Sequence, residues 1–143
     1  MGVCEFCNIK IKEHLLLLIT LITVPLSAHS NTAIDTLLKE YQQVGADTFS
    51  TESGKTFWME THSAQKKPQN RSCTSCHAKN PLDVGQHVRT RKSIEPIARS
   101  VNPERLTDVK KIRKWLKRNC KWTLGRECSA QEKGDILVYL ENI

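Results

Sequence analysis

The sequence lacks internal repeats and low-complexity segments, and no stretch alternates apolar and polar residues as a half-buried strand would. Long apolar runs are also scarce, because only residues 15–26 form one, and that run is too short to span a bilayer. Methionine is scarcer still, since the 143 residues contain Met1, Met59 and no other. These absences argue against a repeat protein, a β-sheet fold or a second domain, and they predict one small helical domain.

The first 30 residues have the pattern of a secretory signal peptide. Two lysines precede the apolar run and two small residues with the spacing of a cleavage site follow it, namely Lys10, Lys12, Ala28 and Ser30. An uncleaved membrane anchor is the alternative, which Pro25 and the shortness of the run disfavour. We therefore expect residues 1–30 to be a cleaved signal peptide and residues 31–143 to be one soluble, periplasmic domain.

The segment Cys73-Thr74-Ser75-Cys76-His77 is the strongest motif in the chain. Two thiols at this spacing can form thioether bonds with the vinyl groups of haem, and the histidine that follows can ligate the iron. A zinc site or a redox dithiol is the alternative. The next cysteine pair, Cys120 and Cys128, is spaced too widely for zinc, and the residues before Cys73 resemble a loop rather than the strand of a redox fold. The motif therefore predicts one covalent haem c with its iron on His77.

Export of the chain decides the roles that we expect for the other four cysteines. Cys4 and Cys7 form a second Cys-x-x-Cys pair, but Asn8 follows them, so the pair lacks a haem ligand and leaves with the signal peptide. Cys120 and Cys128 remain, and we expect them to form a disulfide in an oxidising compartment. Two free thiols are the alternative.

Basic residues outnumber acidic ones by 22 to 15, and the net charge of +7 survives loss of the signal peptide, which carries two residues of each sign. Much of the positive charge lies between Lys110 and Arg118. This run predicts either a docking face for an acidic redox partner or a solvated helix surface with haem propionates as counter-ions. Export argues against nucleic acid as a partner.

The spacing of apolar residues and caps predicts four helices, over residues 32–44, over residues 47–61, from a cap at Asp108 to about residue 119, and from Ser129 to near the C-terminus. In the second helix, Gly54 permits close approach of another helix, with the aromatic Phe57 beside it. Ser129 and Glu132 have the spacing of a capping box at the start of the last helix.

The residues leave the sixth ligand of the iron open. Many monohaem cytochromes c use a methionine downstream of the attachment motif, but Met59 lies upstream, so the candidates are His62, His87, a lysine and Asn119. His87 lies in a polar loop and is more consistent with a surface histidine. Asn119 continues an apolar stripe of the third helix and is expected to point inward, although it is also consistent with a C-cap. The stripe consists of Val109, Ile112 and Leu116.

Several segments together resemble one family. They are Gly85-Gln86, Arg89-Thr90, Ile94-Glu95-Pro96, Asn102-Pro103-Glu104-Arg105-Leu106-Thr107-Asp108, Lys114-Trp115-Leu116-Lys117-Arg118-Asn119-Cys120, Leu124-Gly125-Arg126-Glu127-Cys128 and Glu132-Lys133-Gly134-Asp135. With these residues, most of the chain from 33 to 143 resembles the sphaeroides haem protein family of oxygen-binding monohaem cytochromes c. The chain differs from that family between Phe57 and Cys73, where it is richer in basic residues and includes His62.

The resemblance implies an all-α class I cytochrome c fold. It also implies His77 as the proximal ligand, the side chain of Asn119 as the sixth ligand, and a bridge between Cys120 and Cys128 beside it. The partners that it implies are a dihaem cytochrome c or a membrane b-type cytochrome as electron donor, and a small diatomic ligand such as oxygen or nitric oxide.

We therefore expect a c-type cytochrome that accepts electrons and binds a small ligand at the reduced iron, with Asn119 displaced. An amide is a hard, weak donor that suits ferric iron and holds ferrous iron poorly. The alternative is a simple electron-transfer cytochrome whose iron stays six-coordinate through His87. An enzyme that reduces or oxygenates the bound ligand is a third interpretation, although no residue identifies a catalytic base.

Overall fold

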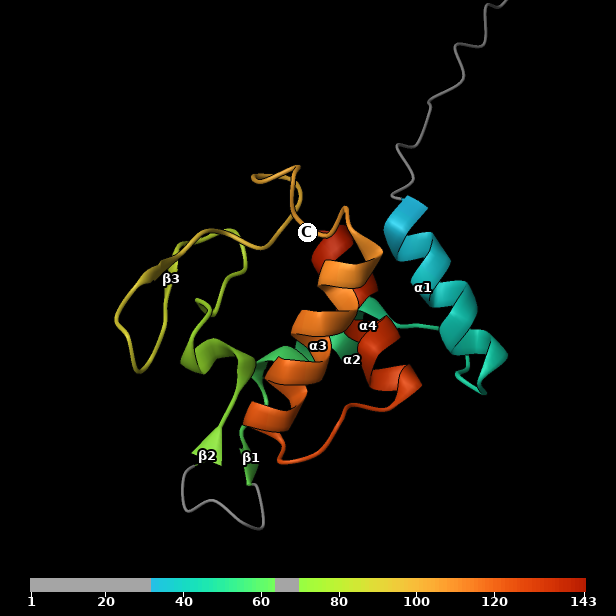
Figure 1. Ribbon diagram of the computed structural model, residues 1–143, viewed down its shortest axis with the longest axis horizontal. Helices are drawn as coiled ribbons and strands as arrows, with labels where there is room; N and C mark the ends of the chain where they lie inside the picture. The colour runs from blue at the N-terminus through green and yellow to red at the C-terminus, as the bar shows by residue number, and fades with distance from the viewer. Residues whose placement is uncertain (1–31, 64–69) are drawn as a thin grey trace, which may run out of the picture.

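The computed structural model describes residues 32–63 and 70–143, which form four α-helices, one 3-10 helix and four short strands (Figure 1). In chain order these are α1 (Thr32–Gln43), α2 (Thr51–Met59), β1 (His62–Ser63), β2 (Asn70–Arg71), η1 (Cys73–Ser75), β3 (Gly85–Gln86), β4 (Ser93–Ile94), α3 (Val109–Thr123) and α4 (Ala130–Glu141). The predicted signal peptide lies outside the described residues. Within them, no helix is long and apolar enough to cross a membrane.

Helices α1, α3 and α4 share one hydrophobic core. Ile34 and Leu37 of α1 and Leu137 of α4 are fully buried, and Ile112 of α3 packs in the same cluster. Burial of a side chain of this size contributes about 1.5–3 kcal/mol, so this cluster is a main source of stability. It fixes α3 against the two helices at the ends of the described chain.

The contact between α2 and α4 is unusually close because glycine lies at the crossing. A Cβ atom at Gly54 would lie only 2.7 Å from Cβ of Tyr139 and would overlap the Asp135 carbonyl group. Trp58 of α2 then packs against Tyr139, with 6.3 Å between ring centroids. The prediction that Gly54 permits a close helix contact is confirmed.

Side-chain caps begin α3 and α4 where the sequence predicted them. Asp108 accepts a hydrogen bond from the backbone N–H of Lys111 (2.9 Å) at the start of α3. At α4, Ser129 and Glu132 each accept from the other's backbone N–H, at 3.1 and 2.7 Å, which is the expected capping box. The second helix begins later than predicted, because Ser50 is its cap and accepts from Ser53 N–H.

The third helix is longer than predicted. It continues to Thr123, and its C-cap is Leu124, whose N–H donates to the Cys120 carbonyl at 2.7 Å. Asn119 therefore lies inside the last turns of α3, and the interpretation of this residue as a C-cap is wrong. Residues 120–123 contain no glycine or proline that would end the helix earlier.

Two short antiparallel hairpins were not predicted. β1 pairs with β2 through His62 and Arg71, and β3 pairs with β4 through Gly85 and Ile94. Strands of two residues are too short to produce an alternating pattern in the sequence. Figure 1 shows the β3–β4 hairpin standing at one side of the molecule, away from α1. The described structure is otherwise helical.

Candidate cofactor site

The two cysteines of the motif lie on one tight turn. Backbone N–H groups of Cys76 and His77 both donate to the Cys73 carbonyl, at 3.3 and 3.0 Å, and the Ser72 N–H donates to Oγ of Ser75 at 3.0 Å. Cys76 and His77 line a cavity beside the turn, whereas Cys73 packs against the apolar cluster that contains Trp58. Neither cysteine forms a disulfide. The turn therefore presents two thiols with an imidazole directly after them.

His77 is half-buried beside an aromatic ring. Its ring centroid lies 5.3 Å from that of Trp58, and Nε1 of Trp58 donates to the Ala78 carbonyl at 3.3 Å. Burial, and to a smaller extent the positive charge of Arg105, lower the pKa of His77 to about 4. The imidazole is neutral at pH 7, which leaves the lone pair of one ring nitrogen available to a metal.

A cavity of about 590 Å³ opens beside His77. Residues 74–78 line one side of it, and residues of the segment from Val84 to Ser93 line the other. A Cβ atom at Gly85 would lie 2.9 Å from Cα of His77, so the β3–β4 hairpin approaches the motif as closely as glycine allows. The volume falls within the range of about 300–1,000 Å³ that is common for sites of small molecules and cofactors.

The Cys73 thiol is the more enclosed part of the motif. It packs against the cluster that contains Trp58 and Leu140, and its burial raises the pKa of Cys73 to about 12. The group is therefore a neutral thiol at pH 7, and a weak nucleophile.

His87 organises the tip of the β3–β4 hairpin. Its Nδ1 accepts hydrogen bonds from the backbone N–H groups of Arg89 (3.3 Å) and Thr90 (3.1 Å). Since Nδ1 is the acceptor, the proton of a neutral ring lies on Nε2, and that nitrogen has no lone pair for a metal. His87 is not among the residues that line the cavity.

Asn119 lies on the surface of α3 in the described structure. The stripe of Val109, Ile112 and Leu116 packs into the core as expected, but the buried face then continues with Cys120 and Thr123, and Asn119 is exposed. The expectation that Asn119 points into the protein core is therefore wrong, because the inward positions of the last turns go to Cys120 and Thr123. Asn119 does not line the cavity beside His77. Its role as a ligand stays a prediction.

Cys120 and Cys128 form the predicted disulfide, with 5.5 Å between their Cα atoms. Both are almost fully buried. Cys120 directly follows Asn119, and Cys128 directly precedes the Ser129 cap of α4. The bridge therefore fixes the backbone beside Asn119 to the start of the last helix.

Sequence reasoning missed several residues around the site. Trp58 had a signal, because it follows Gly54 by four residues and so shares the predicted contact face of α2. No sequence signal pointed to Arg105, because its effect on the pKa of His77 depends on how the segment before α3 folds back. His62 packs against Phe57 at 4.8 Å between ring centroids, and its buried Nε2 has no partner within residues 32–63 and 70–143. His62 does not line the cavity beside His77.

These residues fit a covalently attached haem. Two unbonded thiols on one turn, a neutral imidazole and an adjoining cavity match what the group requires. Buried Nε of Arg99 lacks a hydrogen-bond partner in the part of the chain that the structure describes, as expected near an anionic group. Zinc fits less well, because the described residues contain no cluster of three or more potential metal ligands.

Comparison with known proteins agrees with this chemistry. A family model described as a domain of unknown function, DUF1924, matches residues 44–140. The chain is 38% identical to cytochrome c-type protein SHP of Cereibacter sphaeroides over 104 residues, which cover 73% of this chain and 79% of that protein. It is 41% identical to cytochrome c'' of Methylophilus methylotrophus over 69 residues, 48% of either chain.

Solved structures are similar over a larger part of the chain. Oxidised SHP, described as an oxygen-binding cytochrome c, matches with a TM-score of 0.72 and 35% identity, covering 80% of this chain and all of that one. Oxidised cytochrome c'' matches with a TM-score of 0.67 and 30% identity, covering 78% and 94%. A solution structure of the same cytochrome c'' addresses the structural basis of haem-ligand detachment. The predicted cytochrome c fold is confirmed.

Proposed function

The chain belongs to the family of the DUF1924 domain and of cytochrome c-type protein SHP, and on this premise we propose that it is a periplasmic cytochrome that accepts electrons and binds a small diatomic ligand when reduced. It carries one covalent haem c, which supplies the redox-active iron. We propose that Cys73 and Cys76 hold the haem by thioether bonds and that His77 is the proximal ligand of the iron.

The composition of the cavity wall is the observation that carries this proposal. Among the described residues that line the cavity, His77 is the only histidine, and none is a methionine. A second imidazole or a thioether would bind the iron firmly in both oxidation states. The wall therefore supplies one strong donor, and we propose that the sixth ligand, which is not among these residues, is a weak one that leaves on reduction.

Asn119 is our candidate for that weak ligand. Its amide makes no hydrogen bond within the described residues, and α3 runs past it, so the side chain is not needed to end the helix. The neighbouring Cys120–Cys128 bridge fixes the backbone while the amide stays free. An amide oxygen is a hard, neutral donor that suits ferric better than ferrous iron, so reduction would release it and leave that position to oxygen or nitric oxide.

The alternative with His87 as sixth ligand has less support. Ligation through Nε2 would require the proton to move to Nδ1, and this nitrogen would then lose its two bonds from Arg89 and Thr90. The hairpin tip would have to fold differently to hold such a ligand. We therefore expect His87 to act in the fold of the loop.

The descriptions of the relatives support the same behaviour. SHP is described as oxygen-binding, and cytochrome c'' as a protein whose haem ligand detaches. For this chain we propose a periplasmic location after cleavage of residues 1–30, and a dihaem cytochrome c or a membrane b-type cytochrome as the electron donor.

Absorption spectra of the exported protein test the proposal. The haem should stay with the chain through denaturation and acid-acetone extraction, and the mass should correspond to a chain that has lost about 30 residues. Reduction should convert six-coordinate ferric iron to five-coordinate high-spin ferrous iron, which then binds carbon monoxide within the mixing time. A reduced protein that stays low-spin and resists carbon monoxide would leave only the electron-shuttle alternative.

A further inference from the structure

Arg99 is a cation whose environment is incomplete. Its Nε is buried, and neither a hydrogen bond nor an ion pair joins the side chain to another described residue. A guanidinium keeps its charge at any physiological pH, and a buried donor without a partner is destabilising. Two other arginines differ from Arg99 in this respect, since Arg113 pairs with Glu40 and Arg126 with Glu132. An anion beside Arg99 would supply the hydrogen-bond acceptor that its Nε lacks.

The segment around Arg99 is folded onto the haem motif. Backbone N–H groups of Ile97 and Ala98 donate to the Pro81 carbonyl, at 3.1 and 3.2 Å, which ties this segment to the residues that follow His77. Ile97 also packs against the same apolar cluster as Cys73. Arg99, only two residues from Ile97, is thus anchored close to the site.

Arg105 strengthens the positive charge at this place. Its Nε and Nη2 donate to the carbonyls of Pro96 and Glu95, both at 3.3 Å, and hold the segment in a closed turn. These two bonds leave N–H groups on Nη1 for another acceptor. Arg105 is also the charged group whose field acts on His77.

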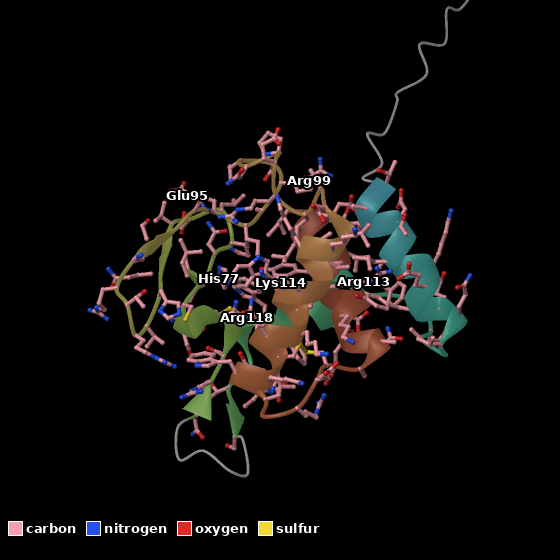
Figure 2. All side chains as sticks on the ribbon, in the orientation of Figure 1. His77, Glu95, Arg99, Arg113, Lys114 and Arg118 are labelled. Atoms are coloured by element: carbon pink, nitrogen blue, oxygen red, sulfur yellow. A yellow bond between two sulfur atoms is a disulfide. The ribbon has the colours of Figure 1, made fainter. Side chains whose placement is uncertain are left out.

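The orientation of the haem is limited by its attachment. The vinyl groups bonded to the cysteines lie on one edge of the macrocycle, and the two propionates lie toward the opposite edge. Figure 2 shows Glu95 and Arg99 beyond His77, on the side opposite to the β1–β2 hairpin that precedes η1. Arg99 and Arg105 do not line the cavity beside His77, so they would meet carboxylates that extend beyond its edge.

We propose that Arg99, assisted by Arg105, binds the propionate carboxylates of the haem. Guanidinium groups match the geometry of carboxylates and form strong, charge-assisted hydrogen bonds with them. The anions would satisfy the buried Nε of Arg99 and close the segment 95–105 over the propionate edge. The inference rests on the proposed function only in requiring that the haem is attached at the Cys73–His77 motif.

The test is the reduction potential of holoprotein variants as a function of pH. Loss of a cation beside the haem disfavours the reduced state, so Arg99→Gln should lower the equilibrium constant for reduction by a common mediator about tenfold, or ~59 mV for one electron. A carboxylate without its guanidinium also has a raised pKa, so the potential should now fall as the pH rises through the neutral range. Arg89→Gln removes the same charge from an exposed position between β3 and β4 and should change neither property.

Resonance Raman spectra give a second readout. The propionate bending bands should shift in Arg99→Lys, because a point charge replaces a planar fork, while the potential stays near that of the wild type. If Arg99→Gln matches Arg89→Gln in potential and pH dependence, the proposal is wrong. If Arg99→Gln takes up no haem, unchanged bands in Arg99→Lys overturn it. Carbon monoxide binding by the reduced wild type is measured separately, so failure of the proposed function would be visible on its own.

Discussion

Asn119 is the residue on which ligand exchange depends in our proposal. Asn119→Ala should give ferric iron that is high-spin or water-ligated and that binds imidazole or cyanide at least about tenfold faster, since a tenfold change needs only ~1.4 kcal/mol. His87→Ala, the matched control, should leave the spectrum unchanged. The opposite pattern, with a low-spin Asn119→Ala and a high-spin His87→Ala, would mean that His87 is the sixth ligand.

His87 makes a separate prediction about its loop. Removal of the Nδ1 acceptor in His87→Ala leaves two backbone N–H groups without their partner, at a net cost of about 0.5–1.5 kcal/mol for each bond. His87→Asn keeps a short side-chain acceptor in the turn and should recover part of that loss. Urea unfolding of the holoproteins measures both. Equal stabilities for the two variants would mean that the acceptor does not hold the turn.

Residue roles were predictable from the sequence only where the chemistry is local. The haem motif needs only the spacing of Cys73, Cys76 and His77, and the disulfide follows from the count of cysteines. The exposure of Asn119 was not predictable from periodicity, because Asn119 and Cys120 are both close to the apolar stripe and the bridge decides which is buried. The unpartnered Arg99 is visible only after the loop has folded back.

At the scale of elements, the crossing of α2 and α4 leaves no room for a side chain at Gly54. Gly54→Ala would push a methyl group into the Asp135 carbonyl and Tyr139 and should destabilise the protein by about 1–3 kcal/mol or more, as overpacking does. Gly45→Ala is the control, because an added Cβ meets nothing within 4 Å there. Its cost should be only that of the positive φ of 96°, about 1 kcal/mol. Thermal unfolding measures the stability of both variants. Equal losses of stability in Gly54→Ala and Gly45→Ala would contradict the close crossing of α2 and α4.

The disulfide joins α3 to α4 over a short loop. Cys120→Ala combined with Cys128→Ala should lower stability by roughly 2.5 kcal/mol in the chain-entropy model. Because the bridge also fixes the backbone next to Asn119, the double variant should exchange its ferric sixth ligand faster than the wild type. Stopped-flow mixing with imidazole measures that rate. A stability loss without faster exchange would limit the bridge to a structural role.

Helix positions were predicted better than helix ends. The first helix matches its predicted range within one residue, because Ile34, Leu37 and Tyr41 repeat on one face. The third ends four residues later than predicted, because Lys121 is a good helix former and no residue from Cys120 to Thr123 stops a helix. Both hairpins were missed, since two paired residues leave no periodic signal.

At the scale of the whole molecule, α3 presents a basic surface. The helix contains no acidic residue, and Figure 2 shows Arg113, Lys114 and Arg118 along it. Arg113 pairs with Glu40, whereas Lys114 and Arg118 have no ion pair in the described part of the chain and flank the half-exposed ring of Trp115. We propose that this surface receives an acidic redox partner.

An anionic oxidant tests this surface. Oxidation of the reduced protein by ferricyanide should slow several-fold as ionic strength rises from about 0.01 to 0.1 M, where screening shortens to about 10 Å. Lys114→Glu with Arg118→Glu should reduce the low-salt rate and its salt dependence. Lys39→Glu with Lys55→Glu makes the same charge change on α1 and α2 and should have a smaller effect. Equal effects of the two pairs would mean that only net charge matters.

The enclosure of Cys73 has a consequence for how the protein matures. Four thiols enter the same oxidising compartment, and four cysteines can pair in three ways. A thiol with a pKa of about 12 supplies almost no thiolate for disulfide exchange, while α3 and α4 hold the other pair at bonding distance. Folding thus favours the Cys120–Cys128 disulfide over the other pairings. A chain that folds before the haem is attached keeps the Cys73 thiol out of incorrect disulfides.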